Sequence, residues 1–231
     1  MIHKARRRLG PALLAACLST PAAAIAAQAE VNGPAATQNA RLTPQDQETI
    51  TQLERYLSGI GTLRARFRQT SSNGARASGD VWLDRPGKLR FEYDSPHPGL
   101  LVSNGHFVVY LDRELEQASY LPVSETPLWF LLKERIDMAA TEDYRVAGVA
   151  RDQGQVRLHV VQAGSEIGEP GSVTLTFQES PLQLTSWRIV DQQGITTEVM
   201  LRDPRFGVQV DSDKFDFGKL DLPDRQRNRR R

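Results

Sequence analysis

After Gly61 the chain alternates apolar and polar residues in one short run after another. In "TLRARFRQT" the side chains of Leu63, Ala65 and Phe67 share one parity, and three arginines share the other. The same period of two recurs in "QVRLHVV", "SVTLTFQ", "SWRIV" and "ITTEVML". This period is typical of strands with one buried face and one wet face. Most of the chain is therefore predicted to form a sheet.

Turn signals that contain glycine separate these runs at hairpin distances. They are Asn73-Gly74, Asn104-Gly105, Gln153-Gly154 and Gln193-Gly194. Short connections of this kind join antiparallel neighbours. We therefore expect a mainly β (α+β) fold, in which about ten or eleven strands form an antiparallel meander.

Two segments have helical features. In "TPQDQETITQLERYLSGIG", Thr43 is a good N-cap, Pro44 suits the first helical position and Asp46 stands at the capping-box position. The second segment, "ETPLWFLLKERI", begins with another threonine and proline and is apolar nearly all round, which predicts a short helix with greasy contacts on both sides. The first helix carries one apolar stripe at helical spacing, formed by Ile50, Leu53, Leu57 and Ile60.

Two short helices can cover only a small part of the apolar surface that so many strands with one apolar face present. Leaving a Leu or Phe side chain in water forgoes about 1.5–3 kcal/mol of burial free energy. Either the sheet closes into a barrel filled by its own side chains, or it stays partly open around a cavity that a ligand fills. The thin helical cover favours the cavity.

The first residues are typical of a secretory signal peptide. Four basic residues in 1–8 precede a short apolar run over 9–18 and then the small residues of "STPAAAIAAQAE". We expect a signal peptide over 1–29 and a flexible leader over 30–42. The tetrapeptide "LAAC", which ends at Cys17, also resembles a lipoprotein signal box with an acylated cysteine. Cleavage at a later A-x-A site is favoured, and it would leave a mature chain without cysteine.

The formal net charge of +1 conceals an asymmetry. The predicted signal peptide and the tail "RQRNRRR", Arg225 to Arg231, hold much of the basic charge, so the predicted domain over 43–222 is acidic. An acidic body argues against nucleic acid as a partner. The basic tail over 223–231 is either a solvated, disordered terminus or a contact for anionic lipid head groups, in which case its deletion should weaken membrane association at low salt only.

No catalytic or metal-binding pattern stands out in the sequence. The histidines after the leader, His97, His106 and His159, have no partner at metal-ligand spacing. The chain lacks a G-x-S-x-G elbow and a phosphate-cradling glycine loop. We therefore expect no enzymatic activity, no metal and no cofactor.

Longer stretches resemble the outer-membrane lipoprotein carrier family, LolA. "GDVWLDRPGKLRFEYDSP" is similar to the family's central motif of a strand, an Arg-Pro turn and an aromatic-rich strand. "LLVSNGHFVVYLDRELEQASYLPV" resembles its next hairpins, and "ETPLWFLL" resembles its lid segment. The resemblance covers nearly the whole predicted domain.

The resemblance implies an unclosed antiparallel β-barrel of about 11 strands, with a short helical lid over an apolar cavity. It implies a periplasmic chaperone that binds the acyl chains of lipoproteins released from the inner membrane. The implied partners are acylated lipoproteins, an inner-membrane lipoprotein-releasing ABC transporter complex and an outer-membrane lipoprotein receptor. It also implies that the carrier itself hydrolyses nothing, and we expect it to be a monomer.

One arginine breaks the pattern of "LDRPGKLRFEYDSP", because Arg85 shares the apolar parity of Leu83 and Leu89. The resemblance makes Arg85 a latch that donates to carbonyls at the ends of the lid helices; alternatively, it begins a turn with Pro86-Gly87 and points to water. From the lid, Leu128, Leu131 and Leu132 would face the cavity. The predicted acyl-binding wall consists of Phe67, Leu83, Leu89, Phe91, Tyr93, Leu175, Phe177, Trp187, Ile189 and Val199.

Two other functions stay open at the level of sequence. One is an anchored relative of the same fold, either a lipoprotein receptor or a lipid-sensing regulator, which would require an acylated Cys17. The other is a lipid or cell-wall hydrolase, which would require a nucleophile–base pair that the sequence does not display.

Overall fold

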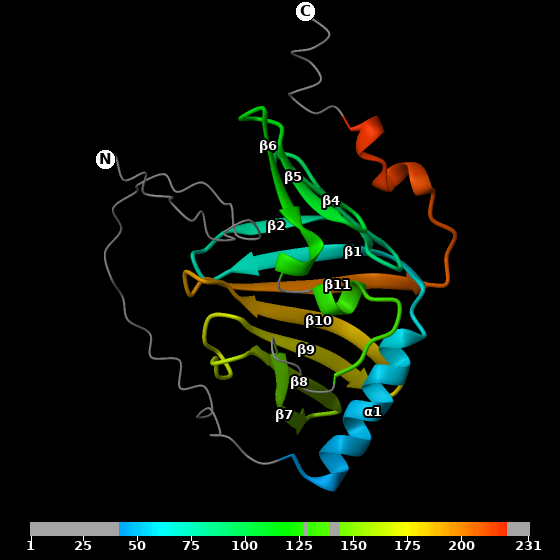
Figure 1. Ribbon diagram of the computed structural model, residues 1–231, viewed down its shortest axis with the longest axis vertical. Helices are drawn as coiled ribbons and strands as arrows, with labels where there is room; N and C mark the ends of the chain where they lie inside the picture. Colours follow the sequence, from blue (N-terminus) through cyan, green and yellow to red (C-terminus); the bar gives the residue numbers. More distant parts are fainter. Residues whose placement is uncertain (1–41, 127–128, 139–143, 221–231) are drawn as a thin grey trace, which may run out of the picture.

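The computed structural model of the chain describes residues 42–126, 129–138 and 144–220. The predicted signal peptide, most of the leader, the basic tail and Leu128 lie outside these residues. The described part contains one sheet of eleven strands (Figure 1). In chain order the strands are β1 (Thr62–Ser71), β2 (Arg76–Asp84), β3 (Lys88–Tyr93), β4 (Gly99–Asn104), β5 (Phe107–Asp112), β6 (Gln117–Pro122), β7 (Tyr144–Asp152), β8 (Gln155–Gln162), β9 (Ser172–Glu179), β10 (Leu182–Val190) and β11 (Thr196–Phe206).

The strands form two meanders that are joined at the first and last strands. The order across the sheet is β6-β5-β4-β3-β2-β1-β11-β10-β9-β8-β7, and every pair is antiparallel. Strands β6 and β7 are the two edges, so the sheet is unclosed among the described residues. The glycines of the predicted turns, Gly74, Gly105, Gly154 and Gly194, all have positive φ, which explains why glycine stands there. The predicted mainly β, unclosed antiparallel fold is confirmed.

Helix α1 (Pro44–Ser58) begins as the sequence predicts. The Thr43 hydroxyl accepts from the Asp46 amide at 3.1 Å, and the Asp46 carboxylate accepts from the Thr43 amide at 2.9 Å. This reciprocal pair is a capping box. The hydrogen bonds at the cap hold the pKa of the Asp46 carboxyl below its ordinary value. The N-terminus of α1 is therefore fixed by local side chains.

Replacing the cap is expected to weaken the fold measurably. Thr43→Ala removes the acceptor for the Asp46 amide and should lower the free energy of unfolding by about 1 kcal/mol. Thr51→Ala is the matched control, because the Thr51 hydroxyl only donates to the carbonyl of Gln47 on the exposed side of the same helix. Urea unfolding of both variants checks this. Equal losses would mean that the cap contributes nothing special.

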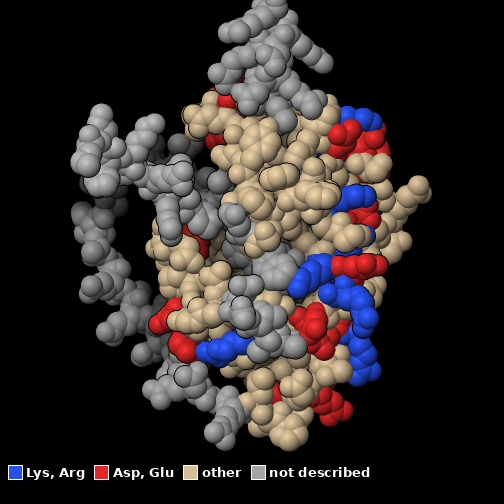
Figure 2. All heavy atoms as spheres, viewed as in Figure 1, with Lys and Arg blue, Asp and Glu red and all other residues tan. Residues whose placement is uncertain are grey.

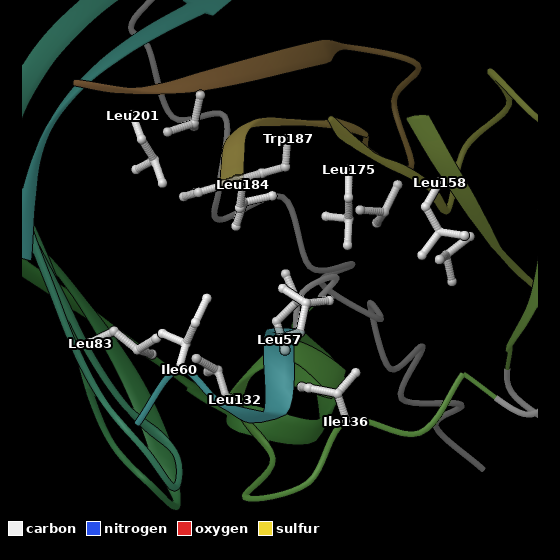
Figure 3. Packing of buried hydrophobic residues seen from close by; sticks show 14 of the residues in the cluster. Leu57, Ile60, Leu83, Leu132, Ile136, Leu158, Leu175, Leu184, Trp187 and Leu201 are labelled. Atoms are coloured by element: carbon white, nitrogen blue, oxygen red, sulfur yellow. The ribbon is translucent and has the colours of Figure 1, made fainter. Parts of the chain in front are cut away.

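The sheet curls so that its apolar face surrounds an interior. Figure 3 shows Leu83, Leu132 and Leu57 on one side of that interior, facing Leu201 and Trp187 on the other. One cluster of buried side chains extends from β1 and β2 round to β8. The apolar stripe belongs to this cluster: Ile50, Leu53 and Leu57 lie on α1, Ile60 follows just after its end, and each is at most 6% exposed. Helix α1 therefore covers the concave face.

The four 3-10 helices are η1 (Val123–Glu125), η2 (Trp129–Leu132), η3 (Ser212–Phe215) and η4 (Phe217–Lys219). The predicted helix in "ETPLWFLL" is represented among the described residues by η2, a single 3-10 turn. Leu131 and Leu132 of η2 are buried in the interior cluster, together with Ile136 and Met138 just after it. Helix α1 and segment 129–138 thus share the closure of the interior.

The outer face of β4 and β5 is also covered, which the sequence analysis did not predict. Leu100, Val102, Val109 and Leu111 form a second buried cluster with Leu220. Phe217 of η4 packs against it, and Lys214 of η3 lies 4.1 Å from the ring centroid of Trp82. The C-terminal turns therefore protect the side of the sheet that faces away from the interior.

Charged side chains of both signs are interspersed on the face in Figure 2, along the margin where α1 and the C-terminal turns lie in Figure 1. Above the centre of that face, the described residues in view are largely uncharged. Among the described residues, no helix is long and apolar enough to cross a membrane.

Candidate functional site: an apolar interior under a helix and a turn

Aromatic rings form a row along the concave face. The ring centroids of Trp187 on β10 and Phe91 on β3 lie 6.2 Å apart, and those of Phe91 and Phe67 lie 4.9 Å apart. Tyr93 continues the row at 5.2 Å from Phe67. Each contact is edge-to-face, the geometry that aromatic quadrupoles favour. The row lines the interior with a continuous apolar surface.

The row depends on a glycine in β2. Gly79 stands opposite Phe67 and Tyr93 in the strand register. A Cβ at position 79 would lie 2.7 Å from Cε1 of Phe67 and 2.0 Å from the carbonyl oxygen of Glu92. Only a residue without a side chain leaves room for the Phe67 ring at this point.

Gly79→Ala is therefore expected to be severely destabilising. A contact with a backbone oxygen cannot be relieved by a rotamer change. The free energy of unfolding should therefore fall by more than the roughly 1–3 kcal/mol that overpacking usually costs. Gly61→Ala is the control, because a Cβ at position 61 meets nothing within 4 Å. Thermal unfolding of the two variants compares them. A Gly79→Ala chain as stable as Gly61→Ala would contradict this view of the aromatic row.

The structure brings the ten predicted wall residues together. Eight of them are buried members of the interior cluster, and Leu89 and Tyr93 are partly buried and pack against it. Leu175 and Phe177 are completely buried, whereas Leu89 keeps some exposure. Leu131 and Leu132 of the predicted lid face the same cluster.

Several residues that line the interior are absent from the predicted wall. The sequence predicts that α1 is amphipathic, but nothing in its stripe says which surface it covers. The sequence also predicts that Val156, Leu158 and Val160 of β8 share one face of a strand, and the structure places all three in the interior cluster. Their alternation was the available signal, since it matches that of the predicted wall strands.

Arg85 lies in the turn between β2 and β3, and the Arg85–Pro86 peptide bond is cis. Its backbone amide donates to the carbonyl of Gly61 at 2.8 Å. Its Nη1 donates to the carbonyl of Leu57 in the last turn of α1. Nε is buried with no hydrogen-bond partner among the described residues. Burial lowers the pKa of Arg85 to about 10, so the guanidinium stays charged at neutral pH.

The guanidinium therefore contacts helix α1, whereas the resemblance to the family predicts acceptors at the ends of the lid helices in general. The carbonyl of Leu57 also accepts from the amide of Ile60 at 3.2 Å just after the helix, and the Gly61 contact holds the turn beside it. The turn meets η2 through Gly87, whose amide donates to the carbonyl of Leu132 at 2.7 Å. The carbonyl of Gly87 accepts from the hydroxyl of Ser103 at 2.6 Å. One short turn thus joins β4, α1 and η2.

An unclosed antiparallel sheet around an apolar interior, with an amphipathic helix for its cover, is typical of proteins that enclose apolar ligands. Comparison with known families identifies which of them this is. The sequence model of the family "Outer membrane lipoprotein carrier protein LolA" matches residues 58–218. The chain belongs to the LolA family.

Individual relatives agree with this assignment. The chain is 30% identical over 174 residues to an outer-membrane lipoprotein carrier protein of Chromohalobacter salexigens, covering 71% of this chain and 80% of that one. It is 26% identical over 181 residues to the protein of that name in Azotobacter vinelandii, covering 74% and 84% of the two chains. The corresponding Methylococcus capsulatus protein is 27% identical over 187 residues, covering 77% and 85%.

Proposed function

We propose that this protein binds the acyl chains of lipoproteins in its apolar interior and carries them between membranes. Membership of a family described as lipoprotein carriers supports the cargo. The observation that carries the proposal is that separate elements, α1 and segment 129–138, fill the concave face with their apolar side chains. A cover of this kind can be exchanged for another apolar occupant.

The free energies of the two occupants are of similar size. The three stripe residues of α1 and Ile60 just after it contribute about 1.5–3 kcal/mol each when buried, or about 6–12 kcal/mol together. An acyl chain of roughly 16 carbons gains about 0.8 kcal/mol per buried CH2, or about 12 kcal/mol. Exchange of cover for cargo is therefore close to balanced, which suits a protein that must both accept and release.

The wall that would contact the chains is the predicted set from Phe67 to Val199. The lid residues Leu131 and Leu132 would lie against the cargo or swing away with η2. We further propose a periplasmic location, uptake from an inner-membrane lipoprotein-releasing ABC transporter complex and delivery to an outer-membrane lipoprotein receptor. The carrier would act as a monomer and would have no catalytic step of its own.

Binding of an environment-sensitive fatty-acyl probe tests the proposal. The chain from residue 30 onward should bind the probe with micromolar or better affinity. Leu89→Glu should weaken binding at least tenfold, because it puts a carboxylate among the wall residues at a position that is only partly buried, so the fold should survive. Leu115→Glu is the control, since Leu115 lies in a surface turn and is 47% exposed. No probe binding, or equal binding by both variants, would contradict an acyl site on this face.

A further inference from the structure

A glutamine side chain is buried on the concave face among the wall residues. Gln69 of β1 is 6% exposed and shares the parity of Phe67. It stands opposite Val199 on β11, a member of the interior cluster. The Tyr93 hydroxyl donates to its Oε1 at 3.0 Å. This bond fixes the amide, because the oxygen is turned toward Tyr93 and the nitrogen away from it.

The other half of the Gln69 amide is an unused donor. Nε2 carries two N–H groups, and no hydrogen-bond partner for it is found in the described part of the chain. Among the described side chains, the nitrogen and oxygen atoms that have neither accessible surface nor a hydrogen-bond partner are Arg85 Nε and Asp191 Oδ2. Nε2 of Gln69 is not one of them, so this unpaired nitrogen keeps some accessible surface and a ligand can reach it. A donor in a side chain this deeply buried costs free energy unless an acceptor comes to it.

The surroundings of Gln69 are the polar end of the aromatic row. The ring of His97 stacks on Tyr93 at a centroid distance of 4.3 Å. Its Nδ1 accepts from the amide of Gly99 at 3.0 Å, and burial lowers the pKa of His97, so the neutral ring carries its proton on Nε2. On the neighbouring strand β11, Thr197 is also 6% exposed, and its hydroxyl lies 3.0 Å from that of Ser71, its partner on β1.

These residues lie at the end of the interior that is farthest from the Arg85 turn. Thr62 pairs with Asp84 beside that turn, and Gln69 follows seven positions along β1, roughly 23 Å away at strand rise. In Figure 1 the arrowhead of β1 points to the side opposite α1. An acyl chain lying on the concave face along β1 would therefore have one end near the cover and the other near Gln69.

We propose that the Gln69 amide is a subsite for the carbonyl that links an acyl chain to the rest of the cargo. This inference rests on the proposed function and adds the polar contact that it lacks. An ester or amide carbonyl offers the acceptor that Nε2 needs, and the adjoining methylenes continue onto Phe67 and Phe91. The subsite sets the direction of the chain, with its carbonyl end at Gln69 and its methyl end toward α1.

A matched pair of ligands tests the subsite. One is a synthetic cysteinyl peptide carrying an S-dipalmitoylglyceryl group, and the other is its dihexadecyl ether analogue, which lacks both ester carbonyls. The wild-type chain should bind the ester roughly tenfold more tightly than the ether, the usual worth of one hydrogen bond. Gln69→Leu should reduce ester binding to the ether value and leave ether binding unchanged. Gln155→Leu, an exposed glutamine of β8, should alter neither.

The outcomes separate this inference from the proposed function. Equal affinity of the wild-type chain for ester and ether, or an equal loss of both in Gln69→Leu, would overturn the subsite while leaving acyl binding intact. Binding of neither ligand by the wild-type chain would overturn the proposed function itself. If Gln69→Leu does not fold, as judged by circular dichroism, Gln69→Met, which keeps the length of the side chain without its donor, is measured in its place.

Discussion

An Arg85→Leu chain is expected to keep its fold and to take up acylated cargo, but to release that cargo about tenfold more slowly. The bond from Nη1 to the carbonyl of Leu57 exists only while α1 lies on the concave face. Charge-assisted bonds contribute about 1.5–3 kcal/mol. Loss of the bond destabilises the closed, empty carrier relative to the carrier with bound cargo. Each 1.4 kcal/mol changes the equilibrium between these two states by a factor of about ten.

Overall stability should change much less than release. The guanidinium is held in a turn whose backbone is fixed by Gly61, and its Nε has no partner among the described residues. A leucine removes the cost of burying that charge, which offsets the lost bond in the unfolding equilibrium. We therefore expect the free energy of unfolding to stay within about 1 kcal/mol of wild type.

The measurement is the rate at which a loaded carrier gives a fluorescent acylated peptide to excess acceptor vesicles. Arg85→Lys should fall between wild type and Arg85→Leu, because an ammonium keeps the charge without the planar fork of the guanidinium. Arg64→Leu controls for the loss of one positive charge, since Arg64 is exposed on the outer face of β1. Release from Arg85→Leu at the wild-type rate would make Arg85 a turn residue and nothing more.

The sequence predicted one side of the sheet well because alternation reports which face of a strand is apolar. Phe67 and Trp187 are distant in the chain, yet both were assigned to the same wall on this signal, and both are in the interior cluster. Arg85 shares this parity, and its partly buried guanidinium contacts α1. It sits in the turn of a hairpin in which Leu83 pairs with Leu89, so positions on either side of the turn keep one parity.

What the sequence could not predict were contacts between elements far apart along the chain. The outer cluster shows this most clearly, because β4 is buried at five successive positions from Gly99 to Ser103. The unbroken apolar run "GLLV" was a sign of a strand covered on both faces. It did not say that Phe217 and Leu220 supply the cover. In the same way, an amphipathic α1 was predictable and its acceptor bond with Arg85 was not.

Phe177→Ala is expected to cause the largest loss of stability among single substitutions in the wall, about 3–5 kcal/mol. Phe177 is completely buried, and the centroids of its ring and of the Tyr56 ring on α1 lie 6.0 Å apart in an edge-to-face contact. The Tyr56 hydroxyl in turn accepts from the amide of Leu184 at 3.0 Å, so the ring supports the seat of α1 on β9 and β10. Phe107→Ala is the control, because Phe107 is 49% exposed on β5 and should cost no more than about 0.5 kcal/mol.

A saturating acyl ligand should restore part of this loss if Phe177 belongs to the acyl-binding wall. Any ligand that binds only the folded chain stabilises it by mass action, about 2.7 kcal/mol at a hundredfold excess over Kd. An acyl ligand that also fills the space left by the missing ring should stabilise the Phe177→Ala variant by at least about 1 kcal/mol more than it stabilises the Phe107→Ala variant. Thermal unfolding with and without the fatty-acyl probe measures both gains. Should the two gains be equal, Phe177 is a core residue outside the wall; if Phe177→Ala does not fold, Phe177→Leu gives the same comparison on a smaller scale.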